Sequence, residues 1–256
     1  MNTRKLLLKL SQRFPKRFAR MNHDRVGLMI GKLPEEVHKI LLCLDFDDEV
    51  YPLVLKEKPD LILTHHPFIY GTRGFVLSHD PVKKALVEKM EKIGTPVYSM
   101  HTNFDIGVDG MNDALSEALG LENVKVVEGD MFMRGGTLPK AMKVEDFARY
   151  AKEKLHVEYG LLIAEGKKEV KSVAIVGGGG SRDWRLAFER GYDIYISGDV
   201  SHHTRRDIVL NHYNYLDLPH EIEKIFVPQM KKILFGIDEN LEIVTVDHEK
   251  CPKVIY

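Results

Sequence analysis

The sequence contains little cysteine: Cys43 and Cys251 are the two cysteines among 256 residues, and they form no CxxC motif. This count argues against a disulfide scaffold and favours a reducing, cytoplasmic location. The chain also lacks any run of 18 consecutive apolar residues, so we expect no transmembrane helix. With a formal net charge of −1, the composition carries no electrostatic sign of nucleic-acid binding.

Two common catalytic motifs are absent as well. The sequence contains no GxSxG nucleophile elbow, and no GKS or GKT follows its glycine-rich segment, which argues against a Walker A loop. Cys43 falls in an apolar, strand-like stretch, and we expect a small buried side chain there and not a nucleophile. The remaining composition, 44% hydrophobic and 29% charged residues, is typical of a soluble globular protein with a sizeable core.

The sequence contains two similar halves. Residues 36–44 (EVHKILLCL) are similar to residues 169–177 (EVKSVAIVG), and residues 60–65 (DLILTH) to residues 193–198 (DIYISG), both at an offset of 133 positions. A chance match between short apolar strings is the alternative to an internal duplication. Strands alternate with helices in each half, which predicts an α/β fold with mixed, mostly parallel sheets. We place the first repeat at residues 1–122 and the second at residues 123–256.

Polar side chains follow four of the predicted strands. The first group is His65 and His66, which come directly after the strand 61–64 and before Pro67. The other groups are His101 with Asp105, Asp199 with His202 and His203, and His220 with Glu221 and Glu223. Ligands of open α/β sheets bind beyond the carboxyl ends of the strands. Imidazoles with carboxylates suit Zn, Fe or Mn, and a carboxylate beside two neighbouring histidines favours a two-metal site.

A glycine-rich segment, VGGGGS, follows a predicted strand and precedes a predicted helix. The amides of Gly178, Gly179 and Gly180, with Ser181, are a candidate phosphate-binding nest at a helix start. A tight strand-to-helix turn without a ligand is the alternative.

Five segments together resemble the NIF-three-like family, whose members are also called GTP cyclohydrolase I type 2 homologs. They are MNHDRVGLMIG, LTHHPFIY, HTNFD with GMNDALSEALGL, VGGGGS and GDVSHHTRRD, in this order over almost the whole chain. The resemblance implies two intertwined α/β lobes with a dinuclear metal centre in the cleft between them. It also implies a homohexameric ring built from dimers. At 256 residues the chain corresponds to the short form of the family, without an inserted domain.

The resemblance also implies a set of metal ligands. It assigns His65, His66 and Asp105 in the first half and His220 in the second. In the second half the family has a GHxxxE pattern, from which this chain departs because Pro219 and Lys224 occupy the glycine and glutamate positions. Glu223 is therefore the predicted last ligand, with Glu221 as the alternative. His101, His202 and His203 are then candidates for catalytic or substrate-contacting groups.

These assignments predict a hydrolase that depends on two divalent metal ions and acts on a nucleotide-like or phosphorylated small molecule. GTP cyclohydrolase activity and phosphoester cleavage are both compatible with such a centre. A metal-binding scaffold or regulatory interaction protein without catalysis is the alternative. An enzyme requires at least one open coordination position, whereas a purely structural metal site is closed.

Overall fold

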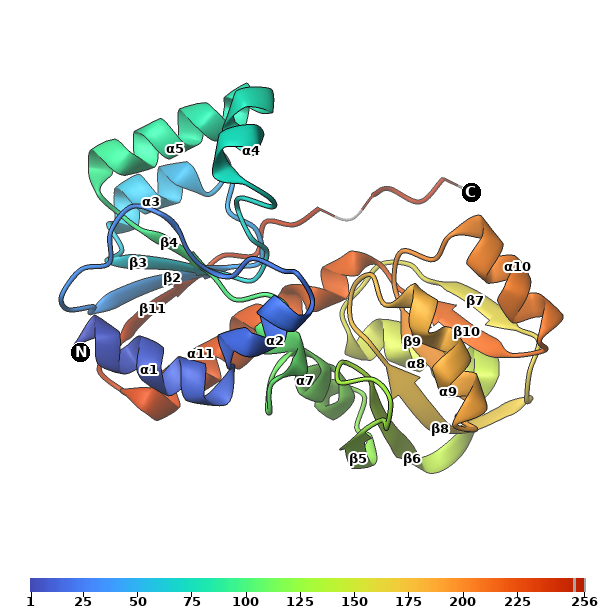
Figure 1. Cartoon of the computed structure of the whole chain (residues 1–256). Helices are drawn as coiled ribbons and strands as arrows, with labels where there is room; N and C mark the ends of the chain where they lie inside the picture. Colours follow the sequence, from blue (N-terminus) through green and yellow to red (C-terminus); the bar gives the residue numbers. More distant parts are fainter. Residues whose placement is uncertain (251, 256) are drawn as a thin grey trace. The chain divides into compact units, whose positions relative to one another are not determined.

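The computed structural model describes residues 1–250 and 252–255, so Cys251 lies outside the described residues. The chain divides into two compact units (Figure 1). The first contains Met1–Gly110 and Phe226–Glu249, and the second contains Met111–Ile225 with the described residues from Lys250 onward. This grouping differs from the contiguous division after residue 122 that the sequence suggests. The difference arises because a C-terminal helix and strand pack in the first unit, a long-range pairing that local sequence patterns do not encode.

The first unit contains a five-stranded sheet in the order β1-β4-β3-β2-β11. Its strands are β1 (Gly27–Ile30), β4 (Val97–Ser99), β3 (Leu61–Thr64), β2 (Lys39–Cys43) and β11 (Glu242–Thr245). The last four strands in this order are parallel, and β1 is antiparallel to β4. The carboxyl ends of four strands therefore lie at one edge of the sheet, as the sequence analysis requires for a site.

Helices cover both faces of this sheet (Figure 1). On one face lie α3 (Tyr51–Glu57) and α5 (Pro81–Ile93), with α4 (Arg73–His79) packed on α5. On the other face lie α1 (Thr3–Arg13) and α11 (Phe226–Ile237), and two short helices, α2 (Lys16–Met21) and α6 (Thr102–Ile106), complete the unit. All four residues of β3 are buried, because helices cover the sheet on both sides and leave the strand no solvent-exposed face.

The second unit contains a six-stranded sheet in the order β5-β6-β8-β9-β10-β7. Its strands are β5 (Glu122–Val126), β6 (Arg134–Lys143), β8 (Glu169–Ile175), β9 (Ile194–Ser197), β10 (Asn214–Asp217) and β7 (Leu161–Ala164). The three strands β8, β9 and β10 are parallel, and the others are antiparallel to their neighbours. The helices are α7 (Met111–Ala118), α8 (Val144–Lys154), η1 (Ser181–Asp183), α9 (Trp184–Glu189), α10 (His202–Leu210) and η2 (His220–Ile225).

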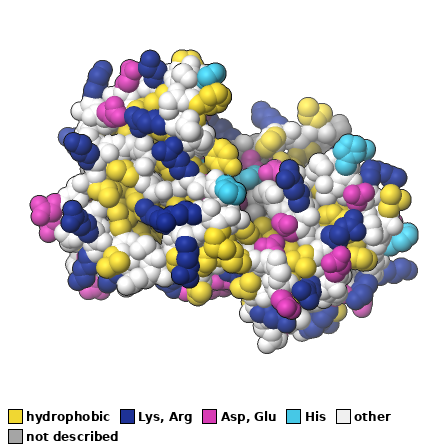
Figure 2. Space-filling view, in the orientation of Figure 1, with side chains coloured by type: hydrophobic (Ala, Val, Ile, Leu, Met, Phe, Trp, Pro, Cys, Tyr) yellow, Lys and Arg dark blue, Asp and Glu magenta, His cyan; other side chains and the backbone are white. Residues whose placement is uncertain are grey.

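The surface of both units is mixed in charge. Figure 2 shows lysine, arginine and carboxylate side chains on each unit, with hydrophobic side chains between them. Among the described residues, no helix combines the length and apolar character that crossing a bilayer requires.

Strand register confirms the internal duplication. Ile40 pairs with Leu61 in the first sheet, and Val173 pairs with Ile194 in the second. Val173 and Ile194 lie 133 residues after Ile40 and Leu61, which is the offset of the sequence repeat, so equivalent positions pair in both sheets.

The duplication extends to one side-chain interaction. Asp60 Oδ2 accepts hydrogen bonds from the amides of His38 and Lys39, both at 2.8 Å. At the positions 133 residues later, Asp193 Oδ2 accepts from the amides of Lys171 and Ser172, at 2.9 and 2.8 Å. In each unit this carboxylate directly precedes one parallel strand and binds backbone amides of the neighbouring parallel strand, which comes earlier in the sequence.

We predict that Asp193→Ala lowers the free energy of unfolding by about 2 kcal/mol, because two backbone amides lose their acceptor. Burial raises the pKa of the Asp193 carboxyl group. The hydrogen bonds from Lys167, Ser172 and Lys171 outweigh this effect, so the pKa in the folded protein lies below its ordinary value. The stabilisation is therefore present above pH 4 and is lost as the pH falls through the folded pKa. Urea denaturation at several pH values measures it. The exposed Glu158→Ala variant is the control and should change stability by less than about 0.5 kcal/mol.

Candidate functional site

Three histidines of the first unit meet at the carboxyl edge of its sheet. His65 and His66 follow β3, and His101 follows β4 and precedes α6. Their ligand atoms lie within 4.8 Å of one another, close enough for one metal ion. His65 is fully buried, and its ring packs 5.3 Å from the ring of Phe226 between centroids. The structure thus places His101 beside the two histidines that the resemblance assigns as ligands.

Each of these imidazoles uses its Nδ1 atom for a hydrogen bond to an oxygen. The acceptors are Met100 O for His65 at 2.9 Å, Asp45 Oδ2 for His66 at 2.8 Å and Asp24 Oδ2 for His101 at 2.9 Å. A carboxylate or carbonyl at Nδ1 fixes the ring orientation and the tautomer, which leaves the lone pair on Nε2. This arrangement is the one that metal-binding histidines ordinarily have.

Asp105 brings a carboxylate to this histidine group. It lies in α6, is 8% exposed, and its Oδ1 is 3.5 Å from His65 Nε2. The amides of Phe104 and Asp105 both donate to the carbonyl of His101, so the short helix turns Asp105 back toward the strand ends. The HTNFD motif therefore places its first and last residues at one site.

Asp24 anchors this segment from the loop before β1. Burial raises the pKa of its carboxyl group, but the hydrogen bond and positive charge of His101 and the bond from Thr102 outweigh that effect and hold the pKa at about 2. Asp24 is therefore ionised throughout the physiological range and favours a proton on His101 Nδ1.

The second unit carries its own group of acidic and imidazole side chains. His220 Nδ1 is 2.6 Å from Asp199 Oδ2, and His220 Nε2 is 3.0 Å from Glu223 Oε2. In the 3₁₀ helix η2, residues three apart lie on the same side, which brings Glu223 to His220. Glu223 is buried and Glu221 is half-buried, so the helix geometry favours the first of the two glutamates considered above.

The charge state of His220 follows from these two neighbours. The hydrogen bond with Glu223 raises its pKa to about 9 against the opposing effect of burial, and Asp199 contributes in the same direction. Without a bound cation, His220 is therefore protonated at neutral pH and bridges the two carboxylates.

The glycine-rich turn lies directly beside this group. Gly178 has φ +61°, and a Cβ atom on it would lie 2.1 Å from Glu223 Oε1. The Gly178 carbonyl accepts hydrogen bonds from the amides of Gly180 and Gly198 and from Ser197 Oγ. The Gly180 amide is thus engaged within the turn. The observed contacts explain why glycine is needed at 178, and the phosphate nest proposed from Gly178, Gly179, Gly180 and Ser181 stays a prediction.

Two further histidines lie outside these groups. His202 and His203 begin α10, where both side chains are exposed and their rings are 5.6 Å apart. They follow the carboxyl end of β9, as the sequence predicts. The two rings contact each other in a T-shaped edge arrangement.

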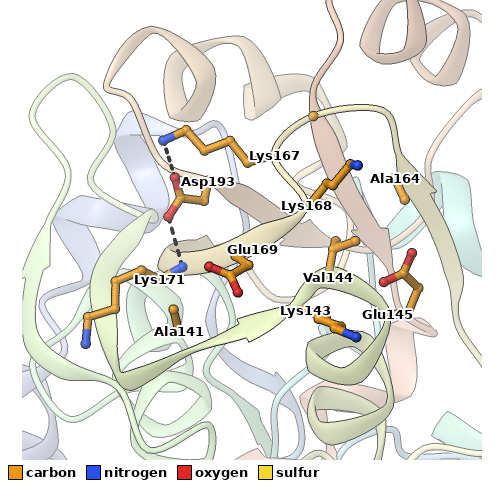
Figure 3. Close-up of a pocket in the computed structure, with 11 residues that line it drawn as sticks. Ala141, Lys143, Val144, Glu145, Ala164, Lys167, Lys168, Glu169, Lys171 and Asp193 are labelled. Atoms are coloured by element: carbon orange, nitrogen blue, oxygen red, sulfur yellow. Dashed lines mark hydrogen bonds and ion pairs between the residues drawn. The ribbon is translucent and has the colours of Figure 1, made fainter.

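A cavity of about 890 Å³ in the second unit lies at the opposite edge of the sheet, at the amino ends of β8 and β9 (Figure 3). Lys167 and the Lys171 amide contact Asp193 there, and Lys171 Nζ donates to the carbonyls of Leu138 and Pro139. Its lining residues do not include Asp199, His220 or Glu223, so the cavity is distinct from the group formed by His220.

The two carboxylates that orient His66 and His101 were not predicted from the sequence. Asp45 follows β2 in the segment LDFDD, and its place directly after a predicted strand could have identified it as a candidate site residue. Asp24 lies in the loop before β1, with no periodic pattern around it, and only the fold brings it to His101.

We predict that Gly178→Ala displaces Glu223 and destabilises the protein, because the new Cβ would overlap Oε1 and φ +61° is unfavourable for alanine. The expected loss is at least about 1 kcal/mol of unfolding free energy. The matched control is Gly179→Ala, whose Cβ would meet Asp199 Oδ2 at an ordinary 3.5 Å. Thermal unfolding of both variants measures the difference, and equal stabilities would contradict the assigned contact.

Comparisons with known proteins agree with the resemblance. The protein from Lactococcus lactis named GTP cyclohydrolase 1 type 2 homolog is 28% identical over 245 residues, which cover 93% of each chain. The Bacillus cereus protein related to NIF3 has a similar fold (TM-score 0.88, 21% identity, covering 100% of this chain and 99% of that one). Reduced HcgD from Methanocaldococcus jannaschii matches with TM-score 0.80 at 26% identity and covers 97% of this chain and 98% of its own. A family model, Duf34/NIF3 (NGG1p interacting factor 3), matches residues 1–252. The chain therefore belongs to the Duf34/NIF3 family.

Proposed function

We propose that this protein is a hydrolase that depends on two divalent metal ions and acts on a nucleotide-like or phosphorylated small molecule. The proposed ligands are His65, His66 and Asp105 from the first unit and His220 and Glu223 from the second. The observation that carries the proposal is the common hydrogen-bonding pattern at Nδ1 of His65, His66 and His101, whose ligand atoms lie within 4.8 Å of one another. The names of the curated relatives support the reaction class.

The donor set fits divalent metal ions. Imidazole nitrogen and carboxylate oxygen are ligands for Zn, Fe and Mn, and the Asp105 and Glu223 carboxylates would balance part of the positive charge. His220 would have to lose its proton to become a ligand, so we expect metal binding to release a proton at neutral pH. Which of the three metals is bound, and the homohexameric ring, stay predictions.

The chain's own residues have distinct proposed roles around such a centre. Two metal ions would activate a water molecule and polarise the carbonyl or phosphoryl oxygen of the substrate. His101, held by Asp24 at Nδ1, is the proposed group that moves a proton during the reaction through Nε2. Asp45 and Asp24 orient the imidazoles, so that ring geometry does not have to be formed anew when substrate binds.

The metal content and the turnover of the protein test the proposed centre as a whole. We expect about two metal ions per chain by elemental mass spectrometry, since a two-metal site requires that number. Turnover of GTP or of generic phosphoesters should disappear on chelation and return when metal is restored. The same metal content without turnover on the whole panel would contradict the hydrolase and favour the metal-binding scaffold.

Substitutions of the proposed ligands Asp105 and Glu223 test the ligand assignment. The Asp105→Ala variant should bind less metal, because the Asp105 carboxylate lies beside His65. The chain should remain folded, because Asp105 lies in a short helix and not in the apolar core. Glu223→Ala should also lower the metal content, whereas the neighbouring Lys224→Ala should leave it unchanged. Metal content by elemental analysis, with circular dichroism as the folding control, provides the measurement. A loss with Lys224→Ala and none with Glu223→Ala would mean that the assigned ligand is wrong.

A further inference from the structure

The C-terminal strand of the first unit ends at the same sheet edge as the histidines. β11 is parallel to β2, with Thr245 opposite Leu42, and the Val246 amide donates to the Leu42 carbonyl at 2.9 Å. Residues 247–249 therefore run beside the residues that follow β2. The residues that follow β2 form the loop that carries Asp45, the hydrogen-bond acceptor of His66.

Two side chains of this C-terminal segment hold that loop. Glu249 Oε1 accepts a hydrogen bond from the Asp45 amide at 3.3 Å, and Glu249 Oε2 accepts from the His248 amide at 3.4 Å. His248 Nε2 donates to Asp47 Oδ2 at 3.0 Å. The side chains of His248 and Glu249 are only 14% and 10% exposed, although they lie close to the end of the chain.

The loop itself is held at a second point. Asp47 Oδ1 accepts from the amides of Glu49 and Val50 at 2.8 and 3.1 Å, so Asp47 caps the turn into α3 while its other oxygen contacts His248. Asp45, in contrast, has a side chain that is 47% exposed. The Asp45 amide donates to Glu249, and the Asp45 carboxylate contacts His66 Nδ1.

We propose that Glu249 is a positioning residue for His66 and acts through Asp45, while His248 holds the same loop at Asp47. The C-terminal segment fixes the loop after β2, the loop fixes the Asp45 carboxylate, and the carboxylate fixes the ring and tautomer of His66. The inference rests on the proposed role of His66 as a metal ligand. It assigns a function to a fifth strand end, which carries none of the residues predicted from the sequence.

The test compares the affinity of the full-length protein for Zn²⁺ alone, measured by competition with a chromophoric chelator. Glu249→Ala should weaken Zn²⁺ binding by up to about tenfold, the lower end of the range for losing a hydrogen-bond partner of a metal ligand, because Glu249 acts on that partner, Asp45. Glu249→Gln should restore most of the affinity, because its carbonyl oxygen still accepts from the Asp45 amide. The control Glu239→Ala removes one exposed carboxylate of the same region and should not alter the affinity. Equal affinities for Glu249→Ala and the unaltered protein would overturn the proposal.

A double-mutant cycle shows whether Glu249 acts through Asp45. Asp45→Ala should weaken Zn²⁺ binding at least as much as Glu249→Ala, and the double variant should be no weaker than Asp45→Ala. Losses that multiply in the double variant would mean that Glu249 acts by another route, and the proposal would be wrong. Thermal unfolding of the chelated variants identifies a general loss of stability, which would likewise count against a positioning role if it accounted for the loss of affinity.

A measurement without metal separates this proposal from the proposed function. Long-range ¹H–¹⁵N spectra of the chelated protein report which ring nitrogen of His66 carries the proton. In the unaltered protein the proton should be on Nδ1, and Glu249→Ala should increase the fraction of the other tautomer. If the protein binds no Zn²⁺ but this shift occurs, the metal function fails and the positioning role stands. An unchanged tautomer would overturn the positioning role.

Discussion

The hydrogen bond between each imidazole Nδ1 and an oxygen acceptor is the interaction on which the candidate site depends. An imidazole on a strand end can rotate about two side-chain torsions and exists in two neutral tautomers. The bonds from His65, His66 and His101 to Met100, Asp45 and Asp24 remove this freedom in the first unit. The three rings are thereby held in fixed orientations, with their ligand atoms within 4.8 Å of one another.

These bonds are possible because the strands are parallel. Parallel strands place their carboxyl ends at one edge, and the register of β2, β3 and β4 decides which residues emerge there. The carboxylates of Asp60 and Asp193 tie neighbouring strands at the opposite edge in the same way in both units. A shift of one residue would direct His65 or His66 to the other face of the sheet, so the chemistry depends on a register that the duplicated cores share.

The duplication preserves the backbone and changes the donors. The position equivalent to Asp45 is Gly178, and the position equivalent to His66 is Asp199, each 133 residues later. In the first unit, the β2 end supplies the carboxylate and the β3 end supplies the imidazole. In the second unit, the β9 end supplies the carboxylate, and the imidazole comes from His220 after β10. Glycine at 178 leaves the space that Glu223 occupies. Each unit therefore builds an imidazole–carboxylate pair from different positions of one ancestral frame.

The sequence by itself determined the α/β class, the repeat and its offset, and the strand ends at which the histidines lie, because these follow from local hydrophobic patterns and direct residue identity. It also pointed to Glu223, although the helical register that selects it over Glu221 became visible only in η2. The tertiary structure alone decided that β11 pairs with β2, that Asp24 reaches His101, and that Glu249 restrains Asp45. These contacts join residues 77 and 204 positions apart in the last two cases. No local pattern encodes such contacts, because they depend on the order of strands in the sheet, which is set by the packing energy of the whole unit.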